Sequence, residues 1–285
     1  MTDAEPRTQR DYLGMELRRL RELAGLSGEA IGAAIGVSQV SASRIERGVK
    51  VPTAAEVGAW ADAVNADAET RERLLQLAEA AHTEVVTWRA ALRGQLHMQG
   101  EIAQSESTAR TIRNYQPLIV PGLLQTADYA RRVFEMSDTG GTRDHAAALG
   151  KRIQRQEILY DTTRRFEFLI TEAALRLRVG GVNTLLAQVD RIISLAALDN
   201  ISVGILPIDR QVTFLGWNPF VIYDDVEEGR PFVRVEMTHG VTTIERPEDV
   251  ALYVSTMNSL RRDAFCDDEA RELLGLIVHT IRDAG

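Results

Sequence analysis

The stretch LSGEAIGAAIGVSQVSASRIERG, residues 26–48, carries the signals of two short helices joined by a tight turn. Ser27 and Ser38 can each cap a helix, because a serine hydroxyl accepts a hydrogen bond from a backbone N–H of the first turn. Gly36 separates the two helical runs, as glycine often does at a helix C-terminus. The pattern therefore predicts a helix-turn-helix whose second helix spans residues 39–47.

The second of these helices has little apolar surface for a buried helix. Val37 and Ile45 are expected to face the core, and Ala42 to lie close to a neighbouring helix. A helix of this size fits the major groove of DNA, where glutamine pairs with adenine, arginine with guanine, and an apolar group with the thymine methyl. The polar face therefore predicts a DNA-reading surface. Its expected DNA-binding residues are Gln39, Val40, Ser41, Ser43, Arg44, Arg47 and Lys50.

Position along the helix predicts roles within this set, in which Arg44 belongs to the face that reads the bases. Gln39 and Val40 lie in the first turn, which approaches the bases, and the two serines after them can contact phosphate or base. Arg47 and Lys50, at and beyond the helix end, are better placed for phosphate. The alternative is an ordinary solvated helix of a small bundle, which the serine and arginine content alone would favour.

Helical periodicity surrounds this motif from Leu13 to about His82. Leu13 and Leu17 belong to an apolar stripe before it, Thr53 can cap a fourth helix, and a fifth begins near Ala68. We therefore expect five short helices in a compact bundle.

The pattern changes after this bundle. Residues 84–114 are predicted to form a helical linker, broken near Gly94 and Gly100. The strands predicted beyond it span 166–171, 201–206, 220–223, 232–236 and 241–244, and the helices span 127–136, 144–160, 182–198, 247–264 and 267–283. The expected fold is multidomain, with an N-terminal all-α helix-turn-helix bundle (1–83) followed by a linker and a larger α+β domain (115–285) whose later strands form a largely antiparallel sheet.

Charge and composition limit the class of protein. The net charge of −8 argues against a protein coated in basic charge, yet between Met15 and Thr53 six basic residues face four acids, a local net charge of +2. One such face binds DNA weakly, so we expect a homodimer that places two faces about 34 Å apart. The single cysteine, an acidic N-terminus and the lack of a long apolar run predict a cytoplasmic protein without a membrane segment. The expected DNA binding would associate it with the nucleoid.

Signals of catalysis and of metal or cofactor binding are weak. The five histidines lie in different segments without ligand-like spacing, and Cys266 has no companion cysteine. The paired glycines in VGGVN and TGGT lack the residues of a phosphate-binding loop. DDVEEG, residues 224–229, is expected to be a hairpin connection with solvated acids, since it lacks the spacing of a calcium loop. We expect no enzyme activity, no metal and no cofactor.

Residues 13–64 resemble the lambda-repressor-like or XRE family of helix-turn-helix domains, with the cap, the turn glycine, GVS, SRIERG and VPT at the family spacing. The resemblance implies DNA binding, and it implies a structural ion pair between Arg21 and Glu46. Gly28 departs from the family pattern, because many relatives carry a glutamine there that reaches the DNA. One anchoring contact is therefore expected to be missing.

The remainder of the chain resembles the DUF5753 family of Scr1-like, antitoxin-type bacterial regulators. The motifs that carry the resemblance are YQPLIVPGLLQTADYARRV (115–133), RIQRQEIL (152–159), ITEAALRLRVGG (170–181) and ISVGILP (201–207). The resemblance implies a transcriptional regulator whose second domain binds a small DUF397-like protein encoded nearby.

The residues of the larger domain leave other interpretations open. VPGLLQT can be a structural loop in which Thr126 caps the next helix, or a loop that contacts a ligand. Arg152, Arg155 and Gln156 lie on one predicted helix, and Glu172 follows a predicted strand. An arginine–glutamate network can hold this helix to the sheet, or the arginines can grip an anionic molecule or an acidic partner tail. A small-molecule sensor would need a deep pocket with aromatic residues such as Phe214, Trp217 and Tyr223. An enzyme fused to a DNA-binding module would need a buried cluster of histidines or acids.

Overall fold

The computed structural model describes residues 9–81, 83–87, 97–138, 144–226, 229–237 and 240–283. The chain divides into two compact units. The smaller unit contains the described residues up to Val85 together with Thr242–Arg246, and the larger unit contains the others.

The smaller unit contains the five expected helices. They are α1 (Gln9–Leu23), α2 (Gly28–Ala34), α3 (Gln39–Glu46), α4 (Ala54–Ala63) and α5 (Ala68–Ala81). Their apolar stripes meet in one core around the fully buried Trp60, Leu17 and Leu74. Burial of these faces, rather than the helix propensity of such short segments, stabilises the bundle.

Two glycines set the angle between α2 and α3. Gly36 adopts φ +75°, a left-handed conformation that lets the chain turn sharply at no steric cost. A Cβ at Gly32 would lie 2.9 Å from the carbonyl oxygen of Val37, so a larger residue would push the turn away from α2. The two helices therefore pack closely, as the sequence predicts for a helix-turn-helix.

The larger unit is built on a mixed sheet. Its strands are β2 (Ala109–Gln116), β3 (Arg165–Thr171), β4 (Ile201–Leu206), β5 (Phe220–Val226) and β6 (Phe232–Met237), in the order β6-β5-β2-β3-β4. β1 (Thr83–Thr87) and β7 (Gly240–Ile244) are neighbours in the same strand order, and the boundary between the units falls within both.

The sheet is only partly antiparallel. β5 pairs antiparallel with β6 and with β2, as expected for the later strands. β2, β3 and β4 run parallel to one another, with Ile112 opposite Phe166, and Phe166 opposite Ile201. Parallel neighbours pair across long connections, which contain helices here, so local sequence patterns do not reveal them.

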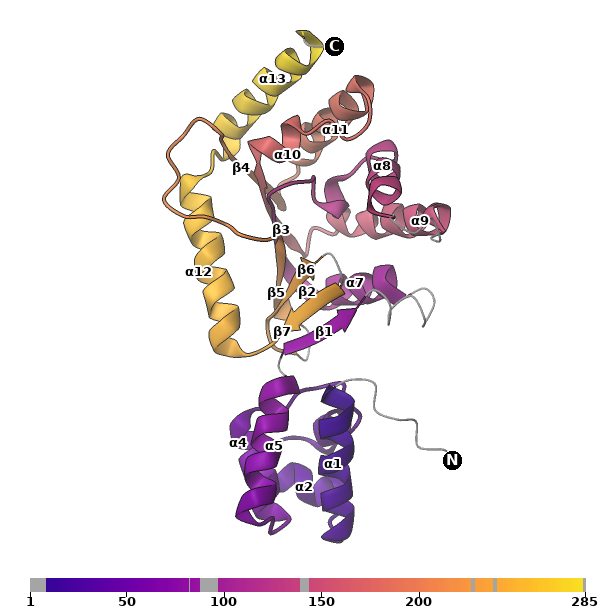
Figure 1. Ribbon diagram of the computed structural model, residues 1–285, viewed down its shortest axis with the longest axis vertical. Helices are drawn as coiled ribbons and strands as arrows, with labels where there is room; N and C mark the ends of the chain where they lie inside the picture. The colour runs from indigo at the N-terminus through magenta and orange to yellow at the C-terminus, as the bar shows by residue number, and fades with distance from the viewer. Residues whose placement is uncertain are drawn as a thin grey trace. The chain divides into compact units, whose positions relative to one another are not determined.

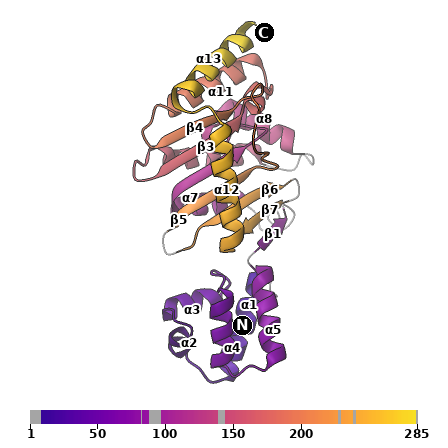
Figure 2. The same cartoon turned by 90° about the vertical axis from the view of Figure 1, so that its left-hand side faces the viewer.

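Helices cover both faces of this sheet (Figure 1). They are α7 (His97–Thr108), α8 (Ala127–Ser137), α9 (His145–Arg155), α10 (Glu172–Arg176), α11 (Val182–Leu195), α12 (Pro247–Asp263) and α13 (Asp267–Asp283). α12 crosses the strands on one face, and α7, α8 and α9 lie on the other (Figure 1 and Figure 2). The main core lies between the sheet and α8, α10, α11 and α13, with Phe168, Tyr129 and Ile192 fully buried.

Two predicted helical segments differ from the structure. Within 84–114, β1 and β2 are strands at either end of α7, and Gly100 lies inside α7 rather than at a break; Gly94 lies outside the described residues. The predicted helix 144–160 ends at Arg155 and continues as a 3₁₀ helix, η2 (Gln156–Tyr160). β2 lies between two partner strands and is held by pairing along its whole length, which overrides its weak local pattern.

Candidate nucleic-acid interface

Local capping fixes where α3 begins. The Ser38 hydroxyl accepts a hydrogen bond from the Ser41 N–H at 3.2 Å, as the sequence predicts. Ala42 and Ile45 are fully buried against the bundle core, and Val37 is partly buried beside them. The buried side of α3 is therefore the expected one, and its other side lies in solvent.

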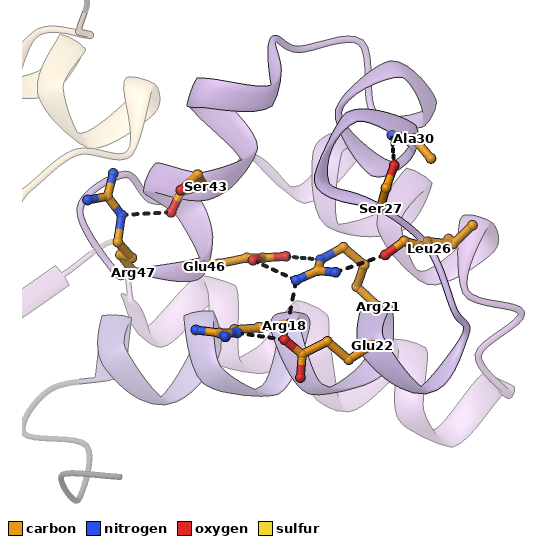
Figure 3. Close-up of polar contacts among 9 residues, drawn as sticks. All are labelled: Arg18, Arg21, Glu22, Leu26, Ser27, Ala30, Ser43, Glu46 and Arg47. Atoms are coloured by element: carbon orange, nitrogen blue, oxygen red, sulfur yellow. Dashed lines mark hydrogen bonds and ion pairs between the residues drawn. The ribbon is translucent and has the colours of Figure 1, made fainter. Parts of the chain in front are cut away.

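The expected DNA-binding residues differ in exposure. Gln39, Val40, Ser43 and Arg47 are exposed, and the Val40 side chain, at 67% exposure, is an apolar group with no core to cover it. Ser41, Arg44 and Lys50 are partly buried. The Arg47 Nε donates to the carbonyl of Ser43 one turn earlier (Figure 3). Both ends of α3 thus present polar groups to solvent, the pattern that base and phosphate contacts require.

An ion pair holds α3 to α1. The Arg21 guanidinium donates to both carboxylate oxygens of Glu46 and, at 2.8 Å, to the carbonyl of Leu26 (Figure 3). The hydrogen bond to Glu46 raises the pKa of Arg21 above its ordinary value. The resemblance implied this pair, and the structure confirms it. Arg21 also reaches the loop before α2, so one side chain sets the position of α3 relative to its two neighbours.

Lys50 has a partner within the protein that its sequence position did not indicate. Its ammonium donates to the Ser41 hydroxyl at 2.9 Å and lies 3.3 Å from a carboxylate oxygen of Glu56. Glu56 also completes the capping box of α4, where it accepts from the Thr53 N–H. Lys50 therefore joins α3 to the start of α4, and a phosphate would compete with Glu56 for its ammonium.

Gly28 lies next to the side chain of Gln39. A Cβ on Gly28 would lie 3.7 Å from the Cγ of Gln39, an ordinary van der Waals contact. A longer side chain at this position would therefore share the space that Gln39 occupies. The glycine that removes one expected DNA contact also leaves Gln39 room to move.

A network of buried amides holds the VPGLLQT segment in the larger unit. Gln125 donates to the carbonyl of Val120 at 2.7 Å, Gln156 to that of Gln125 at 2.7 Å, and Gln188 to that of Leu124 at 2.8 Å. Thr126 caps α8, as predicted. These side chains provide hydrogen-bond partners for the backbone carbonyl groups of the loop. The structure therefore supports the interpretation of VPGLLQT as a structural loop.

The arginines of this unit are paired differently from the prediction. Arg155 binds Glu106 of α7 through two hydrogen bonds of 2.8 and 2.5 Å, whereas Glu172 pairs with Arg176. Arg152 donates to Gln125 at 2.7 Å and stacks on Phe134, and desolvation lowers its pKa to about 10. An arginine–glutamate contact does hold a helix in place, but its acid is Glu106 rather than Glu172.

Two family models match the chain. A model described as a helix-turn-helix domain matches residues 12–74, and the model of a domain of unknown function, DUF5753, matches residues 99–275, more than half of the chain. The chain belongs to the DUF5753 family. No curated protein matches it. The helix-turn-helix followed by a DUF5753 domain is therefore confirmed, and the finer assignment to the lambda-repressor-like family stays a prediction.

The DUF5753 domain does not gather the aromatic residues that a small-molecule pocket was expected to contain. Trp217 is 85% exposed, Phe214 lies at the surface, and Tyr223 is buried in a stack on Phe232. A cavity of about 500 Å³ lies elsewhere in the domain, along α7, α9 and η2. Two arginines that line it, Arg155 and Arg164, are bound to Glu106 and Asp161.

The DDVEEG segment, residues 224–229, begins inside a strand. Asp224 lies in β5 and pairs with Arg113, while Glu227 and Glu228 lie outside the described residues.

Among the residues with described positions, no group of three or more histidines, cysteines or acids is arranged to hold a metal ion. Within the same parts of the chain, no helix has the length and apolar character needed to cross a bilayer.

Proposed function

We propose that the protein is a sequence-specific transcriptional regulator that reads operator DNA with α3. The observation that carries the proposal is the exposed first turn of this helix, where Gln39 and Val40 project from a start fixed by the Ser38 cap. Two helix-turn-helix units of a homodimer would place their α3 helices in successive major grooves. The protein would act in the cytoplasm, associated with the nucleoid.

The proposal extends to the DUF5753 domain, which would bind a small DUF397-like protein and so act in an antitoxin-like regulatory pair. Such a partner changes operator occupancy only if it binds one state of the regulator more tightly than another. We propose no catalytic role for the chain. Burial raises the pKa of the Cys266 thiol, the opposite of the shift that a nucleophilic cysteine needs.

The DNA-reading assignment is tested by the variant Gln39→Ala/Val40→Ala. Both side chains are exposed, so the fold should persist while discrimination between base pairs is lost. Selection from a random duplex library should give a defined motif with the wild-type protein and a degraded motif with the variant. The affinity of the variant for the wild-type motif should fall by about tenfold or more, since one good base contact contributes about 1–3 kcal/mol.

Gln76→Ala provides the matched control, because Gln76 is exposed on α5 and its known partner is Glu72 on the same helix. It should select the wild-type motif with unchanged affinity. An identical motif from wild type and from Gln39→Ala/Val40→Ala would remove α3 from the reading role.

A further inference from the structure

A chain of polar contacts joins α3 to the start of α4 through Lys50. The Lys50 ammonium donates to the Ser41 hydroxyl at 2.9 Å and lies 3.3 Å from Oε1 of Glu56. The Lys50 side chain is 27% exposed and that of Glu56 only 11%, so this ion pair is better shielded from water than a pair on the open surface. Two of the residues expected to contact DNA, Ser41 and Lys50, are therefore engaged within the protein.

The two carboxylate oxygens of Glu56 have different partners. Oε2 accepts hydrogen bonds from the Thr53 N–H at 2.5 Å and from the Thr53 hydroxyl at 2.9 Å, which completes the capping box of α4. Oε1 faces the ammonium of Lys50. Glutamine also completes a capping box, because the cap needs an acceptor oxygen rather than a charge. The effect of the Glu56 charge on Lys50 can therefore be separated from the role of Glu56 as a cap.

The backbone of Lys50 is fixed against α3, whereas its side chain can move. The N–H groups of Val49 and Lys50 both donate to the carbonyl of Arg44, at 2.9 and 3.2 Å. The ammonium lies at the end of a flexible four-carbon stem. It can therefore exchange the Glu56 carboxylate for a phosphate by rotation of side-chain bonds alone, without a change in the fold.

The face that carries α3 has little net positive charge. Between Met15 and Thr53 the local net charge is +2, and counting Glu56 with this segment reduces it to +1. Few other cations are available to attract the DNA backbone, so the state of Lys50 matters. A phosphate that binds Lys50 has to displace the Glu56 carboxylate, and the loss of this ion pair opposes binding.

We infer that Glu56 restrains Lys50 and so lowers the affinity of the helix-turn-helix for the DNA backbone. The inference rests on the proposed function, in which α3 binds DNA, and it adds a contact within the protein that regulates this binding. In every bound copy, the free energy of the contact between Lys50 and Glu56 is subtracted from that of DNA binding. Because phosphate contacts carry no sequence information, the restraint acts on all duplexes alike and leaves base reading to the first turn of α3.

The test compares full-length wild type with Glu56→Gln on two duplexes, one of scrambled sequence and one that carries the motif selected by the wild type. Fluorescence anisotropy should show an affinity up to about fivefold higher for each bound copy of the variant, which is the contribution of a partly exposed ion pair expressed as a ratio. The gain should shrink as KCl rises from about 50 to about 200 mM, because salt screens these charges from one another. Most of it should be lost when Glu56→Gln is added to Lys50→Met, since no ammonium is then left to restrain.

Two further variants control the test. Glu69→Gln removes an exposed acid from the first turn of α5, which makes the same change in net charge on a different helix, and it should leave the affinity unchanged. Glu56→Ala also removes the carboxylate, but the N–H of this position still donates to the Thr53 hydroxyl, a bond of 3.2 Å in the wild type. Its affinity should rise as well, which keeps the test decisive if Glu56→Gln misfolds.

Three results would overturn the inference. An unchanged or lower affinity in both Glu56 variants would assign the contact to the stability of the bundle. An equal gain in Glu69→Gln would show an effect of net charge alone. A gain that is as large in the Lys50→Met background as in the wild type would show that Glu56 does not act through Lys50.

The two duplexes separate this inference from the proposed function. A gain on both duplexes, with a defined motif selected by the wild type, supports both. A gain on the scrambled duplex without any selected motif supports the restraint and overturns sequence-specific reading. A defined motif without a gain on either duplex supports the reading and overturns the restraint, and no binding of any duplex by any of these proteins overturns both.

Discussion

The ion pair between Arg21 and Glu46 fixes the relative positions of several elements of the bundle. Their side chains are only 13% and 12% exposed, and together they connect α1, the loop before α2, and α3. Removing Arg21 would leave the Glu46 carboxylate largely buried without this partner, and removing Glu46 would leave Arg21 to the Leu26 carbonyl and to Glu22 at 3.5 Å. Removing both leaves neither charge in place. The pair was predictable from a family spacing. The contacts of Lys50 with Ser41 and Glu56 were not, since they depend on where the chain runs after α3.

We predict a non-additive double-mutant cycle for this pair. Arg21→Met and Glu46→Met should each lower the free energy of unfolding of the bundle by about 2 kcal/mol, and the double variant should lose less than the sum. Trp60 reports on this unit alone in a Trp88→Phe/Trp217→Phe background, because the chain has three tryptophans and Trp60 is fully buried in the bundle core. Urea unfolding followed by its fluorescence is the measurement. Strict additivity would show that the pair contributes no coupling energy.

At the scale of single elements, local signals predicted some segments and failed for others. α3 was predictable because its cap, its apolar face and its terminating glycine all lie within one short stretch. α13 was also predicted with its observed bounds, and it has an acidic first turn and a buried apolar face. β2 was expected to be helical and is a strand with partners on both sides, β3 and β5, that lie more than forty residues away in sequence. For the same reason, the local patterns did not indicate that β2, β3 and β4 run parallel, nor that Glu106 is the partner of Arg155. The paired residues are far apart in the sequence.

The cap of α3 links its stability to DNA recognition. In Ser38→Ala the Ser41 N–H loses its acceptor, so the turn that carries Gln39 and Val40 should fray. Since such a cap contributes about 1 kcal/mol, we predict a loss of operator affinity of up to about fivefold in fluorescence anisotropy titrations. Ser38→Asn, whose side chain can also cap, should bind as the wild type does. Equal weakening by both substitutions would show that the hydroxyl acts on DNA rather than on the helix end.

The whole molecule combines an acidic chain with a weakly basic reading face. The helix-turn-helix carries a local net charge of +2 between Met15 and Thr53, against −8 for the full chain. Long-range attraction to DNA is therefore small, and affinity has to come from close contacts and from the number of reading faces that engage together. Salt dependence measures that number, because each phosphate that a cation neutralises releases condensed counterions.

We predict that the salt dependence of operator binding will distinguish two bound copies from one. With Arg47 and Lys50 each neutralising a phosphate, a plot of log K against log salt should have a slope of about −2 for one copy and about −4 for two. The proposed homodimer requires the steeper slope between about 50 and about 200 mM KCl. Lys50→Met should make it shallower by about 2, provided that phosphate displaces Glu56 from the ammonium. A slope of about −2 with one protein per operator in sedimentation would contradict the dimer. An unchanged slope in Lys50→Met would assign Lys50 to the bundle rather than to DNA.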